Sequence, residues 1–396
     1  MDSLKKYACC LVLLAGMALQ TSAQLPSLFL ENAATADAIK KNPSEAAKDN
    51  IRQLARQADK LLGKQFGSVM DKNFPTPSGN QHNYMSMAKY YWPDPSKPDG
   101  KPYIKKDGQK NPANDLVSDD KNFDDLIAAV HMLSWAWYFT NDEKYAGKAT
   151  ELIHFWFLDP ETMMLPNLNN AQVRTGIDTG VSTGIIDAHN LPQVADGIGL
   201  LRSSKSWKPA DEKGMQQWFA AYLNWLLTSK NGKKERVAKN NHGSFYDLQV
   251  LTIGLFVNDK KVVDDMLKEL PARMTWQIEP DGKQPLELER TLALSYSTFN
   301  LEAWSLLATA AATRGTDLWH YQTDDGSSLR KAIDYLMPYA TGEKTWDYQQ
   351  IGAYKAQDFY RILLMAAAQF KAPEYKAKAA KIKEENKNVL VKILYE

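Results

Sequence analysis

The stretch that decides the fold is "NFDDLIAAVHMLSWAWYFTNDEKYAGKATELIHFWFL", residues 122–158. Its apolar residues recur with the spacing of one face of an α-helix, both before and after the turn signal Asn141-Asp142. Two helices joined by so short a turn run antiparallel and pack against each other. The stretch therefore predicts a helical hairpin, and we expect the rest of the chain to repeat this unit.

Helical periodicity continues from residue 45 onward, and alternating strand patterns are nearly absent, so we expect roughly eleven helices. Ser44 is a possible cap of the first of them. Besides the opening stretch, the helical runs are residues 44–64, 191–204, 209–229, 243–257, 259–278, 290–315, 329–341, 354–370 and 373–394. The pattern predicts an all-α fold, an (α/α) toroid or incomplete barrel of antiparallel helical hairpins.

Three long segments interrupt the helices, at residues 67–118, 159–189 and 279–289. Long irregular loops in a compact helical protein are usually functional or disordered, and the first is too rich in Tyr and Trp for disorder. We expect these loops to border a groove across the toroid. Helical-repeat binding proteins share this outline, so the architecture alone does not define the function.

The N-terminus reads as a secretory signal over residues 1–23, with a short charged start, the apolar run "YACCLVLLAGMAL" and small residues for cleavage after Ala23. The run is too short for a permanent membrane span. Cleavage would remove both cysteines, Cys9 and Cys10, and leave residues 24–396 as a single domain. We therefore expect a periplasmic or secreted protein that has no membrane partner after signal removal.

Composition narrows the possible partners. Hydrophobic residues make up 44% of the chain and charged residues 24%, as in ordinary soluble proteins, and the formal net charge is +1. Such a balance gives no broad basic field for nucleic acid, so an acidic ligand has to be held by a local cluster. No motif bears on oligomerisation, and a monomer is our expectation.

Motifs for metals and cofactors are absent from the sequence. The six histidines lie far apart, without an HxH or HExxH pattern or a Cys partner, and there is no Gly-rich phosphate loop or GxSxG elbow. We therefore expect neither a metal nor a cofactor.

Two polar clusters stand out instead. In "AKNNHGSFYDLQ", residues 238–249, Asn240, Asn241 and His242 precede an apolar helical run, where a helix needs only one cap. In "PLELERTLALSYSTFNLEAW", residues 285–304, Arg290 is followed six residues later by Tyr296. Taken singly, each has an ordinary structural interpretation, a helix cap in the first case and an exposed Arg with a core Tyr in the second.

A third cluster is the aromatic loop 84–103 with Lys101, Lys105, Lys106 and Lys110 beside it. Stacking aromatics with scattered cations suit a polymer of acidic sugars, while Asn, His and Arg donate hydrogen bonds to a carboxylate. Neutralising a uronate carboxylate makes the C5 proton easier to remove, and a Tyr can pass a proton to the O4 leaving group. The three clusters together thus indicate β-elimination at a uronate.

The motifs "NNHGSFYD", "PLELERTLALSYSTFNLEA", "NYMSMAKYYWPDP", "PYIKKDGQKNP", "LPNLNNAQ" (165–172) and "GIIDAHNL" (184–191) resemble the alginate lyase family of helical-toroid polysaccharide lyases, over about residues 50–370. The resemblance implies that Asn241 and His242 neutralise the substrate carboxylate, that Arg290 is the active-site arginine and that Tyr296 is the catalytic tyrosine. Six helical residues leave two side chains about 120° apart. Arg290 and Tyr296 can therefore converge only if Arg290 lies at the helix start or on the preceding loop.

We also expect a set of residues that bind the acidic polysaccharide without taking part in the chemistry. They are Asn240, Tyr91, Trp92, Lys105, Lys106, Gln172 and Arg174. The backbone N–H groups at the helix start, next to Asn241 and His242, should favour the substrate's anionic group as well.

The leading interpretation is a secreted lyase that cleaves alginate, and three alternatives stay open at this point. The polymer could be glucuronan or another glucuronate chain. A helical-toroid glycoside hydrolase would need two carboxylates, and Asp187, Asp247, Glu287 and Glu289 are available. A non-catalytic protein would bind the glycan and leave it whole. The sequence also leaves open the uronate preference, endo or exo action, and whether His242 is a base or only a carboxylate ligand.

Overall fold

The hairpin of residues 122–158 forms as α3 (Asp119–Thr140) and α4 (Glu143–Ile153) in the computed structural model, which describes residues 25–382 and 388–396. Asn141 ends α3 in the left-handed conformation, with φ 54°, and its N–H donates to Trp137 O. The side chain of Asp142 accepts from Lys144 N and caps α4. The turn signal therefore ends one helix and begins the next, as the sequence predicts.

Each of the other predicted helical runs also contains a helix, and the run 373–394 contains two. The predicted cap Ser44 accepts from Ala47 N. The remaining helices are α1 (Ala33–Lys41), α2 (Glu45–Leu62), α5 (Pro192–Leu201), α6 (Pro209–Thr228), α7 (Lys230–Arg236), α8 (Asn241–Phe256), α9 (Lys260–Gln277), α10 (Pro285–Leu288), α11 (Ala293–Ala312), α12 (Leu329–Ala340), α13 (Gln357–Phe370), α14 (Pro373–Ala379) and α15 (Val389–Tyr395). The helices α1, α7 and α10 are short and were not predicted.

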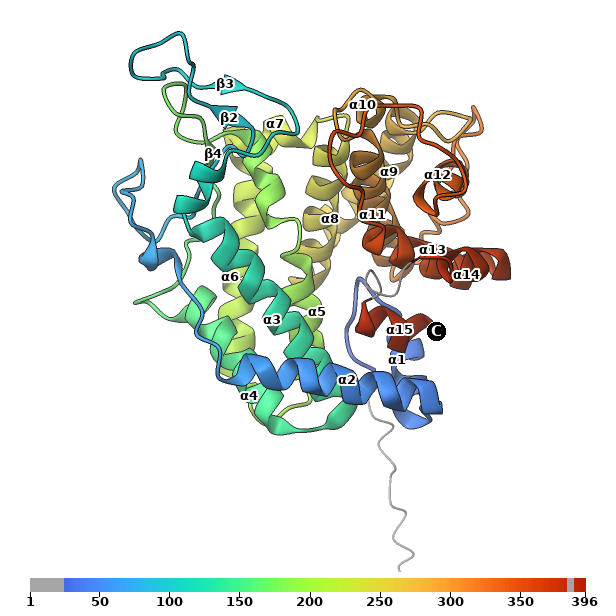
Figure 1. The fold of residues 1–396 in the computed structure, drawn as a ribbon. Helices are drawn as coiled ribbons and strands as arrows, with labels where there is room; N and C mark the ends of the chain where they lie inside the picture. The colour runs from blue at the N-terminus through green and yellow to red at the C-terminus, as the bar shows by residue number, and fades with distance from the viewer. Residues whose placement is uncertain (1–24, 383–387) are drawn as a thin grey trace, which may run out of the picture.

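The helices form an inner and an outer layer, which confirms the predicted (α/α) toroid. The inner helices α3, α5, α8, α11 and α13 pack one against the next, and α15 and α2 connect α13 back to α3 (Figure 1). In α8 only His242 and Leu255 are not buried, and in α5 only Gln193. Helices that are apolar on all sides belong inside a protein. The outer helices α4, α6, α9, α12 and α14 each cover an inner neighbour.

Residues from the two ends of the described chain meet where α13 and α15 pack. Arg361 of α13 lies 2.6 Å from Glu31, and the Tyr395 hydroxyl of α15 donates to the same carboxylate at 2.5 Å. Glu31 is only 4% exposed, so both contacts are made inside the protein. Because the pair is buried, each charge depends on its partner, and the contact fixes the N-terminal segment to the ring.

The long loops gather at one end of the toroid, where they form four short strands. Strand β1 (Met85–Met87) pairs in parallel with β4 (Asn170–Val173), and β2 (Tyr91–Trp92) pairs antiparallel with β3 (Ile104–Lys105). Figure 1 shows β2, β3 and β4 at the upper end of the molecule, the end that also carries α7 and α10. The sequence predicted almost no strands, and the short strands that do form all lie in the long loops, where their pairing fixes the path of the chain.

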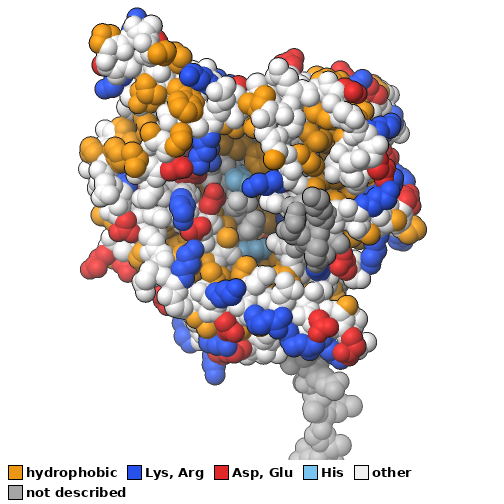
Figure 2. All heavy atoms as spheres, in the orientation of Figure 1, with side chains coloured by type: hydrophobic (Ala, Val, Ile, Leu, Met, Phe, Trp, Pro, Cys, Tyr) orange, Lys and Arg blue, Asp and Glu red, His pale blue; other side chains and the backbone are white. Residues whose placement is uncertain are grey.

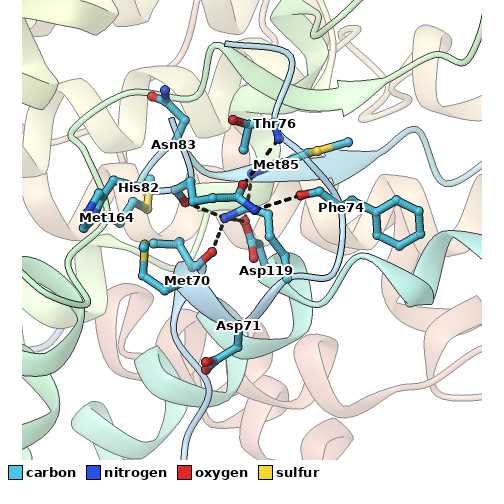
Figure 3. Close-up of polar contacts among 12 residues, drawn as sticks. Met70, Asp71, Phe74, Thr76, His82, Asn83, Met85, Asp119 and Met164 are labelled. Atoms are coloured by element: carbon cyan, nitrogen blue, oxygen red, sulfur yellow. Dashed lines mark hydrogen bonds and ion pairs between the residues drawn. The ribbon is translucent and has the colours of Figure 1, made fainter. Parts of the chain in front are cut away.

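A buried ion pair anchors the first of these loops to α3. Lys72 and Asp119 lie 3.0 Å apart with both side chains fully buried, and Asp119 also accepts from Met85 N at 2.9 Å (Figure 3). Lys72 donates to Gln81 O at 2.7 Å as well. Burial raises the pKa of Asp119 to about 6 and lowers the pKa of Lys72. The start of β1 is thus fixed to the core, which sets the position of the aromatic loop that follows.

The predicted signal segment, residues 1–23, lies outside the described residues. Within the part of the chain that the structure describes, no helix combines the length and the apolar character that a membrane span requires.

Candidate functional site

A cavity of about 740 Å³ opens among the loops and the starts of α8 and α11. Figure 2 shows a hollow near the centre of the face in view, with histidine atoms inside it and Lys and Arg side chains around it. The cavity is lined by nine of the eleven predicted site residues, namely Tyr91, Lys105, Gln172, Arg174, Asn240, Asn241, His242, Arg290 and Tyr296. The two others, Trp92 and Lys106, do not line it.

Arg290 and Tyr296 converge in the way that their spacing allows. Arg290 lies in the turn between α10 and α11, before the helix that carries Tyr296 begins at Ala293. Its guanidinium carbon is 3.7 Å from the centre of the Tyr296 ring. Asp107 holds the guanidinium through two hydrogen bonds, to Nε at 3.1 Å and to Nη2 at 2.8 Å. Burial alone would raise the pKa of Asp107, but Arg290 outweighs it and holds that pKa well below its ordinary value.

The hydroxyl of Tyr296 meets a second hydroxyl. Tyr90 Oη lies 2.6 Å from Tyr296 Oη, close enough for a strong hydrogen bond. Burial, together with Tyr90, raises the pKa of Tyr296 well above its ordinary value, and the charge of Arg290 offsets this only in part. At neutral pH the Tyr296 hydroxyl therefore keeps its proton and is a proton donor.

Asn241 lies at the first position of α8, beside a carboxylate that the sequence analysis did not place here. Glu287 of α10 accepts from Asn241 N at 2.6 Å and from Asn241 Nδ2 at 2.7 Å. Asn240 occupies the N-cap position, but its side chain makes no capping hydrogen bond. The backbone N–H of Asn241 that we expected to face the substrate is thus bound by Glu287, whose negative charge also suits the helix N-terminus. The Asn241 amide group has a second N–H, and its side chain lines the cavity.

His242 is oriented by a buried glutamate. Its Nδ1 lies 2.6 Å from Glu235 Oε1, and the Glu235 side chain is only 2% exposed. A carboxylate at Nδ1 accepts a hydrogen bond from the N–H of that nitrogen, which leaves Nε2 as the atom that can act on a ligand. Glu235 also lines the cavity, and α7, which carries it, packs against the start of α8.

The aromatic loop contributes Tyr91 to the cavity. Arg174 donates to the Tyr91 hydroxyl at 3.3 Å and is paired with Asp178. Lys105, which lies opposite Tyr91 in the β2–β3 pair, is 3.3 Å from Asp107. These cations line the cavity while each already has a carboxylate partner.

Trp92 and Lys106 contact each other. Lys106 Nζ is 5.2 Å from the Trp92 ring centre, and Trp92 Nε1 donates to Gln109 O at 2.8 Å. Their predicted contact with the substrate stays a prediction, and their position outside the cavity does not favour it.

Gln172 lies in the wall formed by β4. Its Nε2 donates to Asp187 at 2.9 Å, its backbone N–H donates to Ser86 Oγ at 2.8 Å, and its φ of 52° is in the left-handed region. Asp187 also accepts from the Tyr84 hydroxyl at 3.2 Å. Burial raises the pKa of Asp187 to about 6. The bonds of Asp187 hold β1, β4 and the Gln172 side chain together.

The four carboxylates that the sequence offers for a glycoside hydrolase do not meet in the cavity. Of the four candidates, only Asp187 lines the cavity. Asp247 is bound to Arg273 in a buried ion pair, and Glu287 is bound by Asn241. Within residues 25–382 and 388–396, no group of three or more His, Cys, Asp or Glu residues is arranged to hold a metal ion.

Several cavity residues were missed by the sequence analysis. Lys89, Tyr90 and His189 lie within motifs that carry the family resemblance, so a signal was present without indicating their roles. Glu235 follows two lysines, a pattern typical of a solvated helix face. Glu287 does not line the cavity but binds Asn241, which does, across 46 residues of sequence. No local pattern reports a contact of that kind.

Comparisons with known proteins match this chain to one family and to several solved structures. The profile of the family described as alginate lyase matches residues 68–346. The crystal structure of an alginate lyase from Bacteroides ovatus superposes with a TM-score of 0.89 at 38% identity, covering 93% of this chain and 99% of that one. A comparison with curated proteins found no significant match.

More distant structures share the fold. Alginate lyase A1-III from Sphingomonas species A1 gives a TM-score of 0.53 at 14% identity, over 88% of this chain and 92% of that one. A histidine-to-alanine variant of alginate lyase A1-III complexed with tetrasaccharide gives 0.55 at 15% identity, over 82% and 88%. The family match and the 38% identity show more than the fold. The chain belongs to the alginate lyase family and is a polysaccharide lyase.

Proposed function

We propose that the protein cleaves alginate by β-elimination and leaves a 4,5-unsaturated uronate at the new chain end. The observation that carries the proposal is the convergence of Asn241, His242, Arg290 and Tyr296 on one cavity. Three of them have side chains that can donate hydrogen bonds to a substrate carboxylate, and the fourth is a neutral hydroxyl. β-Elimination at a uronate requires both, the donors to neutralise the sugar's carboxylate and the hydroxyl to transfer a proton.

In the proposed reaction the substrate carboxylate is bound by the Asn241 amide, His242 and Arg290. Removal of the C5 proton spreads negative charge onto that carboxylate, so donors that are already in place stabilise the transition state more than the ground state. Glu287 holds the Asn241 side chain at 2.7 Å and Asp107 holds Arg290 at 2.8 Å, which fixes two of the three donors.

Tyr296 is the proposed proton donor to the O4 leaving group. Its raised pKa keeps the hydroxyl protonated, and the Tyr90 hydroxyl at 2.6 Å fixes its direction. In mannuronate the C5 hydrogen and the O4 bond lie on the same side of the ring. Tyr296 can act as the base there only as the phenolate, formed by loss of its own proton to solvent when the substrate binds, and Arg290 over its ring favours that phenolate. The phenolate takes the C5 proton, and the phenol so formed gives this proton to O4 as the glycosidic bond breaks.

His242 in its neutral form is the proposed base for guluronate, in which the C5 hydrogen lies on the opposite face. As a donor to the substrate carboxylate it must instead carry a proton on Nε2, so the two roles belong to two protonation states of the ring. Glu235 at Nδ1 leaves Nε2 free to take the proton and stabilises the imidazolium that results. The Bacteroides ovatus relative is named an alginate lyase, which supports alginate over glucuronan as the polymer.

We also propose that the protein acts in the periplasm or outside the cell, on the strength of the signal pattern in residues 1–23. Fractionation of cells that express the full chain, with N-terminal sequencing of the product, tests this. Recovery in the cytoplasm with residues 1–23 attached would contradict it.

One panel of substrates tests the function. The purified protein is incubated with polymannuronate, polyguluronate, glucuronan and hyaluronan, and the ultraviolet absorbance of the unsaturated product is followed. We expect activity on one or both alginate polymers. Activity confined to glucuronan would move the assignment to that polymer, and new reducing ends without absorbance would indicate hydrolysis.

A further inference from the structure

Part of the cavity wall lies beyond the segment that the family profile matches. The profile ends at residue 346, whereas residues 353–358 contribute Ala353, Tyr354, Lys355, Gln357 and Asp358 to the lining. We call residues 347–358 the wall segment. The family match assigns no role to its side chains.

Backbone and side-chain bonds fasten the wall segment to the start of α11, the helix that carries Tyr296. Gln349 O accepts from Ala293 N at 2.9 Å, and Ile351 N donates to Thr291 O at 3.0 Å. Gln350 Nε2 donates to Ser295 Oγ at 2.8 Å. Further along, the Tyr354 hydroxyl lies 3.0 Å from that of Thr298. Side chains that follow these contacts are therefore held in place beside the catalytic tyrosine.

The cations that line the cavity differ in whether a carboxylate of the protein pairs with them. Five lysines and arginines line it, and four have a carboxylate within ion-pair distance: Lys89 with Asp120, Lys105 and Arg290 with Asp107, and Arg174 with Asp178. Lys355 is the fifth cation of the cavity lining, and no carboxylate of the described residues lies within ion-pair distance of its amine. The charge of Lys355 lowers the pKa of Asp358 without an ion pair between them, but burial has the larger effect and raises that pKa.

An exposed cation without a partner inside a cavity for a polyanion points to a ligand charge. The carboxylate of the uronate to be cleaved already has three proposed donors, Asn241, His242 and Arg290. A cavity of about 740 Å³ is within the range that holds drug-sized ligands, which are larger than one sugar ring. The remaining cation is thus available for the next uronate of the chain.

We propose that Lys355 binds the carboxylate of the uronate adjacent to the cleavage point and so helps to select polyuronates with a charge at that position. The proposal rests on the proposed function, because it assumes a uronate polymer in the cavity. It adds a specificity-determining residue from a part of the chain outside the matched family segment.

Steady-state kinetics on the preferred alginate polymer test this, with wild type, Lys355→Met, Lys355→Arg and the control Lys60→Met, which removes an exposed lysine of α2 that does not line the cavity. Lys355→Met should raise KM about fivefold, as expected for one exposed ion pair, with the effect on KM larger than on kcat. Lys355→Arg should restore most of the affinity, and added salt should shrink the difference between wild type and Lys355→Met. Lys60→Met should match wild type.

Binding is measured separately in a Tyr296→Phe background, by calorimetry with an alginate tetrasaccharide, so that cleavage does not interfere. A Kd unchanged by Lys355→Met would overturn the proposal, as would an arginine variant as weak as the methionine variant, because charge would then not be the cause. An inactive wild type would instead refute the proposed function, so the two failures are distinguishable.

Discussion

Replacing Glu287 with glutamine tests whether the buried carboxylate beside Asn241 sets the geometry of the site. Glu287 is 1% exposed and accepts two hydrogen bonds from Asn241, at 2.6 and 2.7 Å. Glutamine keeps the shape but turns one oxygen into an NH₂ group, so that two donors face each other. A hydrogen bond to a charged group contributes about 1.5–3 kcal/mol, and losing one of the two should misplace the Asn241 amide at a cost of about 2 kcal/mol. If that cost falls on the transition state, kcat decreases about 30-fold.

The unfolding free energy should change by less than this, because neutral glutamine avoids the desolvation that raises the pKa of Glu287. The assay compares kcat and KM with urea unfolding for Glu287→Gln and for the control Glu289→Gln, an exposed neighbour that does not line the cavity. We expect Glu289→Gln to match wild type in both. Wild-type turnover in Glu287→Gln would refute the reasoning, since Asn241 would then be placed without its carboxylate partner.

The remaining predictions concern the base role of His242, the need for a metal ion and the buried carboxyl group of Asp196. His242→Gln keeps a hydrogen-bond donor but is a poor base, so rates should fall more on polyguluronate than on polymannuronate if the enzyme accepts both; equal losses would leave His242 as a carboxylate ligand only. Full activity should survive chelation, measured by product absorbance after treatment with a chelator; loss that one divalent ion restores would contradict neutralisation by side chains alone. Burial raises the pKa of Asp196 to about 7, although Phe29 N and Leu30 N donate to it. A raised folded-state pKa means that wild type loses stability as pH increases from about 4 to about 7, by up to about 4 kcal/mol relative to Asp196→Asn, measured by urea unfolding across that range; a pH-independent difference would contradict this.

The helices were predictable because each depends on its own residues. The α3–α4 hairpin follows from apolar spacing around Asn141-Asp142, and α2 from Ser44 and the run behind it. The exceptions are also local in origin. Helices α1, α7 and α10 have at most nine residues, too few to show a clear period. The short strands of the loops were missed because strands of two to four residues show no alternation.

The site was predictable in its family motifs and less so in the residues that orient them. The spacing argument placed Arg290 ahead of the helix of Tyr296, and the structure confirms that placement. Glu235 and Glu287 could not be foreseen, because the sequence does not show which buried carboxylate will reach a given His or Asn. The wrong expectation was the free N–H at Asn241, since an anion from the protein itself occupies it.

The central claim is that the Tyr296 hydroxyl moves the proton in β-elimination, and Tyr296→Phe tests it most directly. The variant keeps the ring beneath Arg290 and deletes only the oxygen that meets Tyr90. Initial rates of unsaturated product are measured on polymannuronate and polyguluronate, with tetrasaccharide binding as the check on an intact cavity. The account predicts wild-type binding and a loss of nearly all turnover on either polymer. Substantial turnover with normal binding would contradict it and remove Tyr296 from the chemical step.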